Sequence, residues 1–91
     1  MILPEISKPD TSMLHIDGPQ LVKGYDSNLV FTIDSEDNGK FIVNSDKVEI
    51  KEMTNTSCVL EILTGRSFSF VLSYIVEGKN PIELPIKVQS I

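Results

Sequence analysis

Three consecutive runs of strand-forming residues fill the C-terminal third of the chain: 57–63 (SCVLEIL), 67–76 (SFSFVLSYIV) and 81–91 (PIELPIKVQSI). The last run alternates between two faces, and its apolar face consists of Ile82, Leu84, Ile86 and Val88. A period of two is typical of a strand that buries one face. Short glycine-containing segments, 64–66 and 77–80, separate the runs as turns. We therefore expect the last run to be a paired strand of a closed β-domain.

Shorter runs upstream follow the same pattern. We expect strands over residues 13–17, 20–23, 28–34, 40–44 and 47–51. Their inward-facing residues should be Leu29, Phe31, Ile33, Phe41, Val43, Val48 and Ile50. Asn38-Gly39 favours positive φ and predicts a hairpin between the third and fourth of these strands. Seven or eight short strands spaced near ten residues, with no helical period, predict an all-β, two-sheet antiparallel β-sandwich over residues 13–91. A five-stranded barrel is the alternative, but it uses fewer strands.

Residues 1–12 are expected to form an extended N-terminal arm. Pro4 and Pro9 prevent regular strand pairing there, and the segment after Ser7 is polar. Three apolar residues of the arm, Ile2, Leu3 and Ile6, could contact a neighbouring subunit. A terminus without fixed contacts is the alternative.

Composition limits the classes of partner. The chain has 91 residues, enough for one domain, and its net charge is −5. Its eight lysines and arginines are scattered rather than clustered, which argues against binding to nucleic acid or to an anionic membrane. No apolar run approaches the ~20 residues of a membrane helix, and the first residues do not resemble a signal peptide. We expect either a complete cytosolically made protein or a domain cut from a longer one.

Few residues suggest chemistry, and we expect no catalytic site, metal site or cofactor. The segment 34–39 (DSEDNG) has the oxygen ligands and glycine of a calcium loop, but Ser45 stands where a bidentate carboxylate is needed. An acidic turn is the simpler interpretation. His15 has no second histidine to work with. Cys58, the single cysteine, cannot form an internal disulfide and should be a small buried residue of its strand. Asn55-Thr56-Ser57 matches a glycosylation acceptor but is expected to be a polar loop.

Several segments resemble bacterial and tailed-phage immunoglobulin-like (Big-type) domains. The similar segments are 16–19 (IDGP), 39–48 (GKFIVNSDKV) and 60–70 (LEILTGRSFSF), and the resemblance covers residues 13–91. The chain differs in having Phe41 where tryptophan is common and Phe68 where many relatives have a small residue. The resemblance implies an immunoglobulin-like sandwich that serves display, adhesion or assembly rather than catalysis.

One group of residues suggests a contact surface. Val71 and Ile75 lie on the face of run 67–76 opposite to its aromatic residues, and Ile42 should lie on a neighbouring strand. Together they would form an apolar patch on an outer sheet face, which can mark a partner surface. Ordinary strand propensity is the alternative explanation. We therefore expect a non-enzymatic module that binds protein partners or copies of itself, as an accessory or decoration component of a tailed-phage virion. A bacterial cell-surface adhesin module and a carbohydrate-binding sandwich are the alternatives.

Overall fold

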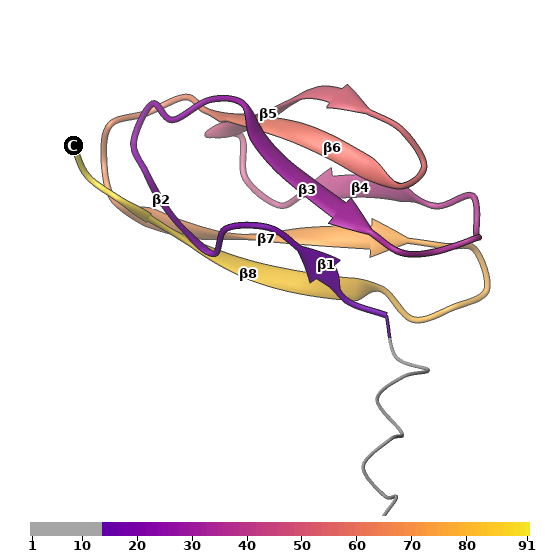
Figure 1. Cartoon of the computed structure of the whole chain (residues 1–91). Helices are drawn as coiled ribbons and strands as arrows, with labels where there is room; N and C mark the ends of the chain where they lie inside the picture. Colours follow the sequence, from indigo (N-terminus) through magenta and orange to yellow (C-terminus); the bar gives the residue numbers. More distant parts are fainter. Residues whose placement is uncertain (1–13) are drawn as a thin grey trace, which may run out of the picture.

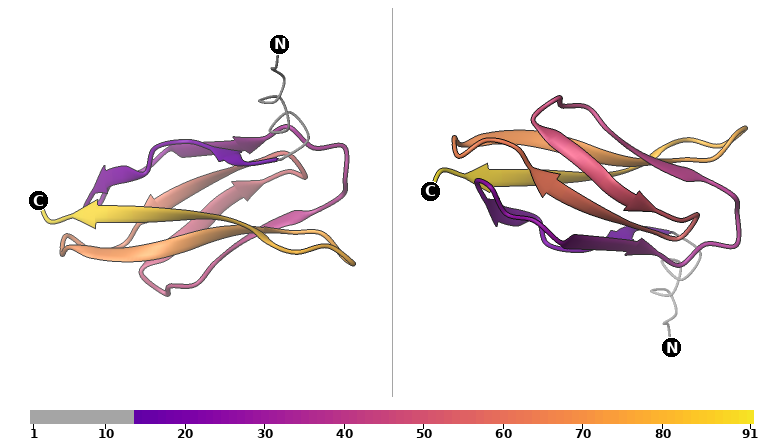
Figure 2. Two further views of the ribbon diagram at one scale, coloured as in Figure 1. Left: turned by 90° about the horizontal axis from the view of Figure 1, so that it is seen from below. Right: turned by 90° about the horizontal axis from the view of Figure 1, so that it is seen from above.

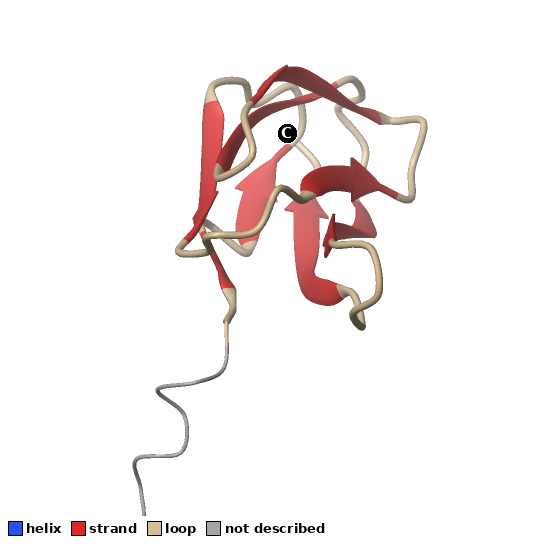
Figure 3. Cartoon of the chain, turned by 90° about the vertical axis from the view of Figure 1, so that its right-hand side faces the viewer, coloured by secondary structure: helices blue, strands red, loops and turns tan. Residues whose placement is uncertain are grey.

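The computed structural model describes residues 14–91, and this part of the chain is all-β. Its strands are β1 (Ile16–Asp17), β2 (Leu21–Lys23), β3 (Leu29–Ile33), β4 (Lys40–Val43), β5 (Val48–Met53), β6 (Ser57–Ile62), β7 (Phe68–Ile75) and β8 (Ile82–Gln89). Figure 3 looks onto one end of the molecule and shows only strands and loops in the described residues. Within them, no helix is long and apolar enough to cross a membrane. The predicted arm and its residues Ile2, Leu3 and Ile6 lie outside the described residues.

The strands form two four-stranded sheets that pack face to face. One sheet has the order β1-β3-β6-β5 and the other β2-β8-β7-β4 (Figure 1). All neighbours are antiparallel except β2 and β8, which are parallel. This is the strand order of an immunoglobulin-like sandwich, with the first strand divided between the two sheets. The predicted fold class is therefore confirmed.

The division of the first strand occurs at Asp17-Gly18-Pro19, where the sequence predicted a break. β1 pairs with β3 in one sheet, and β2 pairs with β8 in the other. Gly18 makes the crossing possible because an added Cβ would lie 2.2 Å from the ring of Phe31. The backbone thus passes directly over a core side chain. The described chain begins at one end of the sandwich, and Ile91 lies at the other (Figures 1 and 2).

The core lies between the sheets and follows the predicted alternation. The buried side chains come from every strand: Ile16, Val22, Phe31, Ile33, Phe41, Val48, Cys58, Leu60, Ile62, Phe70, Leu72, Tyr74, Ile86 and Val88. Among the other predicted inward residues, Leu29, Val43, Ile50, Ile82 and Leu84 are partly buried and pack against this core. Aliphatic side chains and four aromatic rings therefore fill a core in which antibody domains have a tryptophan and this chain has none.

The predicted hairpin at Asn38-Gly39 is wrong. β3 belongs to one sheet and β4 to the other, so residues 34–39 cross between the two sheets at one end of the sandwich instead of joining neighbouring strands. Neither Asn38 nor Gly39 has positive φ. Gly39 is required for a steric reason, since an added Cβ would lie 2.5 Å from Cζ of the buried Tyr74.

The fifth strand is longer than predicted. The sequence suggested an end at Lys51, but β5 continues to Met53 through a β-bulge between Ile50 and Glu52. The bulge places two residues opposite one and resets the alternation. As a result Met53 comes close to β4, where its sulfur accepts a hydrogen bond from the Phe41 N–H at 3.2 Å.

Candidate interaction surface

The apolar patch of Ile42, Val71 and Ile75 lies on the outer face of the β2-β8-β7-β4 sheet. Ile42 of β4 is opposite Ser73 of β7, so Val71 and Ile75 lie two residues to either side of that pair on the same face. Ile42 is 45% exposed, and the other two side chains are half-buried. The sheet therefore brings together the three side chains that the sequence grouped. We call these three residues the outer patch.

Pro85 extends the outer patch onto β8, where it is opposite Val71. Pro85 also prevents a further strand from pairing with β8 on the side of β2. β2 covers only Lys87–Gln89 of β8, Pro85 has no N–H to donate, and its carbonyl accepts a hydrogen bond from Gln20 Nε2 at 3.0 Å. A partner is therefore expected to bind the face of this sheet rather than add a strand beside β8.

The outer face of the other sheet is more strongly charged. Glu49 and Glu61 are directly opposite each other, and Lys51 Nζ lies 3.8 Å and 3.4 Å from their carboxylates. Val30 and Val59 form a smaller apolar pair on this face, with Val30 54% exposed. This pair offers a matched control for the outer patch.

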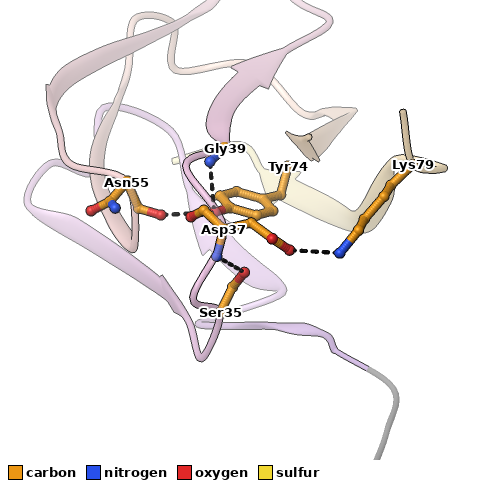
Figure 4. Close-up of polar contacts among 6 residues, drawn as sticks. All are labelled: Ser35, Asp37, Gly39, Asn55, Tyr74 and Lys79. Atoms are coloured by element: carbon orange, nitrogen blue, oxygen red, sulfur yellow. Dashed lines mark hydrogen bonds and ion pairs between the residues drawn. The ribbon is translucent and has the colours of Figure 1, made fainter. Parts of the chain in front are cut away.

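Three connections meet at the end of the sandwich where β3 and β7 finish: residues 34–39, 54–56 and 76–81. We call them the loop end. The hydroxyl of Tyr74, which is fully buried, joins the first two: it donates to the Asn55 carbonyl at 2.8 Å and accepts from the Gly39 N–H at 3.1 Å (Figure 4). The Asp37 carbonyl, 3.1 Å away, is a second acceptor. Lys79 Nζ adds the third connection through a 2.9 Å ion pair with Asp37.

Other contacts give Ser35, Asp37 and Asn38 of the acidic segment 34–39 structural roles. Asp37 pairs with Lys79, and the Asp37 N–H donates to Ser35 Oγ at 3.1 Å. Asn38 Oδ1 accepts a hydrogen bond from Asn55 Nδ2 at 3.0 Å. Across residues 14–91 no three histidine, cysteine or carboxylate side chains group as a metal site would require.

The two isolated candidates, His15 and Cys58, are not part of the outer patch. His15 Nε2 contacts Asp17 Oδ1 at 2.9 Å on the surface, and both side chains are well exposed. Cys58 is buried in the core, as the sequence predicted. Burial raises the pKa of its thiol from 9.0 to about 12, so the thiolate that a nucleophile requires is disfavoured.

We expect Cys58 to resist alkylation by iodoacetamide at pH 8 in the folded protein and to react readily in guanidinium chloride. The folded pKa lies above the unfolded one, so the neutral thiol contributes stability below pH 9.0, and this contribution is lost as the pH rises towards about 12. Mass spectrometry of the alkylated chain measures the reaction. Equal reaction rates in both states would contradict the burial of the thiol.

The sequence did not indicate a second apolar group, at the opposite end from the loop end. Tyr25 and Ile91 both lie beside Gly65, are 62% and 75% exposed, and are held by hydrogen bonds to Thr64 and Gly65 carbonyls. Tyr25 has a φ of 59°, which is unfavourable for a bulky residue. A tyrosine after a glycine gives no signal of such a conformation in the sequence, and the group became visible only in the structure.

Comparison of the chain with protein-family models, with curated proteins and with solved structures finds no match.

Proposed function

We propose that this protein is a non-enzymatic structural or interaction module that acts through protein–protein contact as an accessory or decoration component of a tailed-phage virion, on the head, neck or tail. Its work is to bind a protein partner, in the simplest case another copy of the chain. The setting rests on the resemblance to immunoglobulin-like domains of phages and bacteria.

The observation that carries the proposal is the outer patch on a hydrogen-bonded sheet. Ile42, Val71 and Ile75 converge from two hydrogen-bonded strands, and Pro85 continues the apolar area onto a third. An apolar area rimmed by polar side chains is typical of a contact surface. Lys40, opposite Ile75, and Glu83, two residues before Pro85 on β8, supply such a rim. Ser73 lies within the patch, between Val71 and Ile75 and opposite Ile42.

A module of a bacterial cell-surface adhesin is the second candidate. It is favoured by one observation: the described chain enters at one end of the sandwich and Ile91 lies at the other (Figure 2). Domains with this geometry can be joined end to end in a tandem array. Such a module would be a spacer, and it would be monomeric when isolated.

Carbohydrate binding has less support. Sugar sites commonly stack the ligand on exposed aromatic rings. Of the two tyrosines, Tyr74 is fully buried, so only Tyr25 presents a ring to solvent. Catalysis is not part of the proposal, because within residues 14–91 Cys58 is buried and His15 is paired only with Asp17 on the surface.

Light scattering on the purified full chain tests the contact function. We expect an oligomer whose mass falls to that of the monomer in a double variant, Val71→Glu with Ile75→Lys, because charged side chains in the centre of an apolar contact lose their hydration without gaining partners. Its net charge is unchanged, so altered overall repulsion would not explain the loss. A version lacking residues 1–12 tests whether the arm contributes to the same contact.

The matched control is Val30→Glu with Val59→Lys on the other outer face, which introduces the same two charges at two apolar positions that are opposite each other on β3 and β6. It should leave the oligomer intact. If both double variants lose the oligomer, the effect is general destabilisation rather than contact. A wild-type chain that is monomeric at all concentrations would exclude self-association and favour the adhesin-module candidate.

A further inference from the structure

Asn38, in the crossing from β3 to β4, is chemically the most reactive asparagine in the chain because Gly39 follows it. It is the single Asn-Gly pair of the sequence. In such a pair the backbone nitrogen of glycine can attack the side-chain amide carbon of asparagine, since glycine has no side chain to hinder it. A bond forms between Gly39 N and Asn38 Cγ, ammonia leaves, and water then opens the cyclic imide to aspartate or isoaspartate.

Packing against Tyr74 explains why the chain retains this pair. An added Cβ at residue 39 would lie 2.5 Å from Tyr74 Cζ and 2.7 Å from the Ile75 carbonyl oxygen. The second of these is backbone and cannot rotate away. Glycine is therefore needed here for close packing rather than for a turn, and the reactive dipeptide is a by-product of that packing.

The same tyrosine holds the attacking group away from its target. The Gly39 N–H donates to the Tyr74 hydroxyl at 3.1 Å, and that hydroxyl is itself anchored by the Asn55 carbonyl at 2.8 Å (Figure 4). The group that is attacked, the side-chain amide of Asn38, is held separately, because Asn38 Oδ1 receives a hydrogen bond from Asn55 Nδ2 at 3.0 Å. Attack requires Gly39 to leave the phenol and the Asn38 amide to leave Asn55, so the loop end must open first.

We propose that Asn38 is a masked deamidation site, protected in the closed loop end and modified when the loop end opens. The product adds a negative charge next to Asp37. In its isoaspartate form it also lengthens the backbone before Gly39 by one carbon. Gly39 then no longer fits under the Tyr74 ring. A loop end that has opened and reacted cannot return to its original packing, so the reaction is a one-way change at this end of the sandwich.

The test follows the mass of the peptide that contains residues 38 and 39 while the full chain is incubated at neutral pH, folded or in guanidinium chloride. We expect deamidation to be at least about tenfold slower in the folded protein. Tyr74→Phe keeps the ring and removes the hydroxyl. Loss of this buried hydrogen-bond group should raise the folded rate about tenfold, which corresponds to about 1.4 kcal/mol. Isomerisation at Asp17-Gly18 does not change the mass and does not interfere.

Two controls separate local protection from overall stability. Val88→Ala truncates a buried residue of β8 outside the loop end and lowers stability without touching the Tyr74 hydroxyl. At temperatures that give the two variants equal stability, and with each rate divided by that of the same variant in guanidinium chloride at the same temperature, it should deamidate more slowly than Tyr74→Phe. Asn38→Gln should abolish the mass change in this peptide. Equal rates in folded and unfolded wild type, or equal rates in Tyr74→Phe and Val88→Ala, would overturn the proposal.

Discussion

Replacing Phe31 by alanine should lower the free energy of unfolding by about 3–5 kcal/mol. The ring is completely buried in β3, an interior strand of its sheet, and Gly18 passes directly over it. Removing it leaves a cavity beneath the crossing between β1 and β2. Against a total stability of ~5–10 kcal/mol for a domain of this size, the variant should be close to unfolding at physiological temperature.

Urea denaturation followed by circular dichroism measures this effect as a lower midpoint with an unchanged slope. The neighbouring Val30→Ala is the control, because Val30 points to the outer face of the same strand and is mostly exposed. It should change the free energy of unfolding by no more than about 0.5 kcal/mol. Similar losses in both variants would mean that the inward and outward faces of β3 are assigned incorrectly.

Gly24→Ala should be nearly as damaging, with a loss of about 3 kcal/mol. An added Cβ would lie 2.5 Å from Gly65 Cα and 2.8 Å from the Thr64 carbonyl oxygen, both of which are backbone atoms. No side-chain rotation relieves this contact. The connection between β2 and β3 would have to move away from the one between β6 and β7, to which Tyr25 donates a hydrogen bond at 3.1 Å.

Gly78→Ala is the matched control for this variant. Gly78 has a φ of 83°, but an added Cβ would meet nothing within 4 Å. Its cost is confined to the left-handed backbone conformation, about 1 kcal/mol. Thermal unfolding of the two variants compares them directly. A Gly78→Ala variant as unstable as Gly24→Ala would show that backbone conformation, rather than close packing, decides both positions.

The strands and the core could be predicted because their signal is local. Alternation in 57–63, 67–76 and 81–91 assigns each side chain to a face from its immediate neighbours alone, and burial of Leu60, Leu72 and Ile86 follows from it. The outer patch could be predicted by the same rule, since the spacing of Val71 and Ile75 places them on one face. Only the position of Ile42 beside them needed an assumed strand order.

The features that the sequence did not indicate depend on contacts between distant segments. Gly39 is glycine because Tyr74, 35 residues later, lies against it. β5 ends at Met53 because its sulfur meets an N–H of β4 after a bulge. In both cases the local pattern suggested a different and ordinary interpretation, a hairpin turn and a polar loop. Rules based on neighbouring residues cannot predict such contacts between residues that are distant in the sequence.

The parallel pairing of β2 with β8 has a mechanical consequence. Leu21–Lys23 runs alongside Lys87–Gln89 in the same direction, while the chain enters and leaves at opposite ends of the sandwich. Tension between the two ends therefore pulls these strands past each other along their length. Their hydrogen bonds, including Lys87 N–H to the Gln20 carbonyl and Gly24 N–H to the Gln89 carbonyl, both 2.8 Å, are loaded together rather than one after another. Breaking them together should require more force than peeling the same hydrogen bonds apart one at a time.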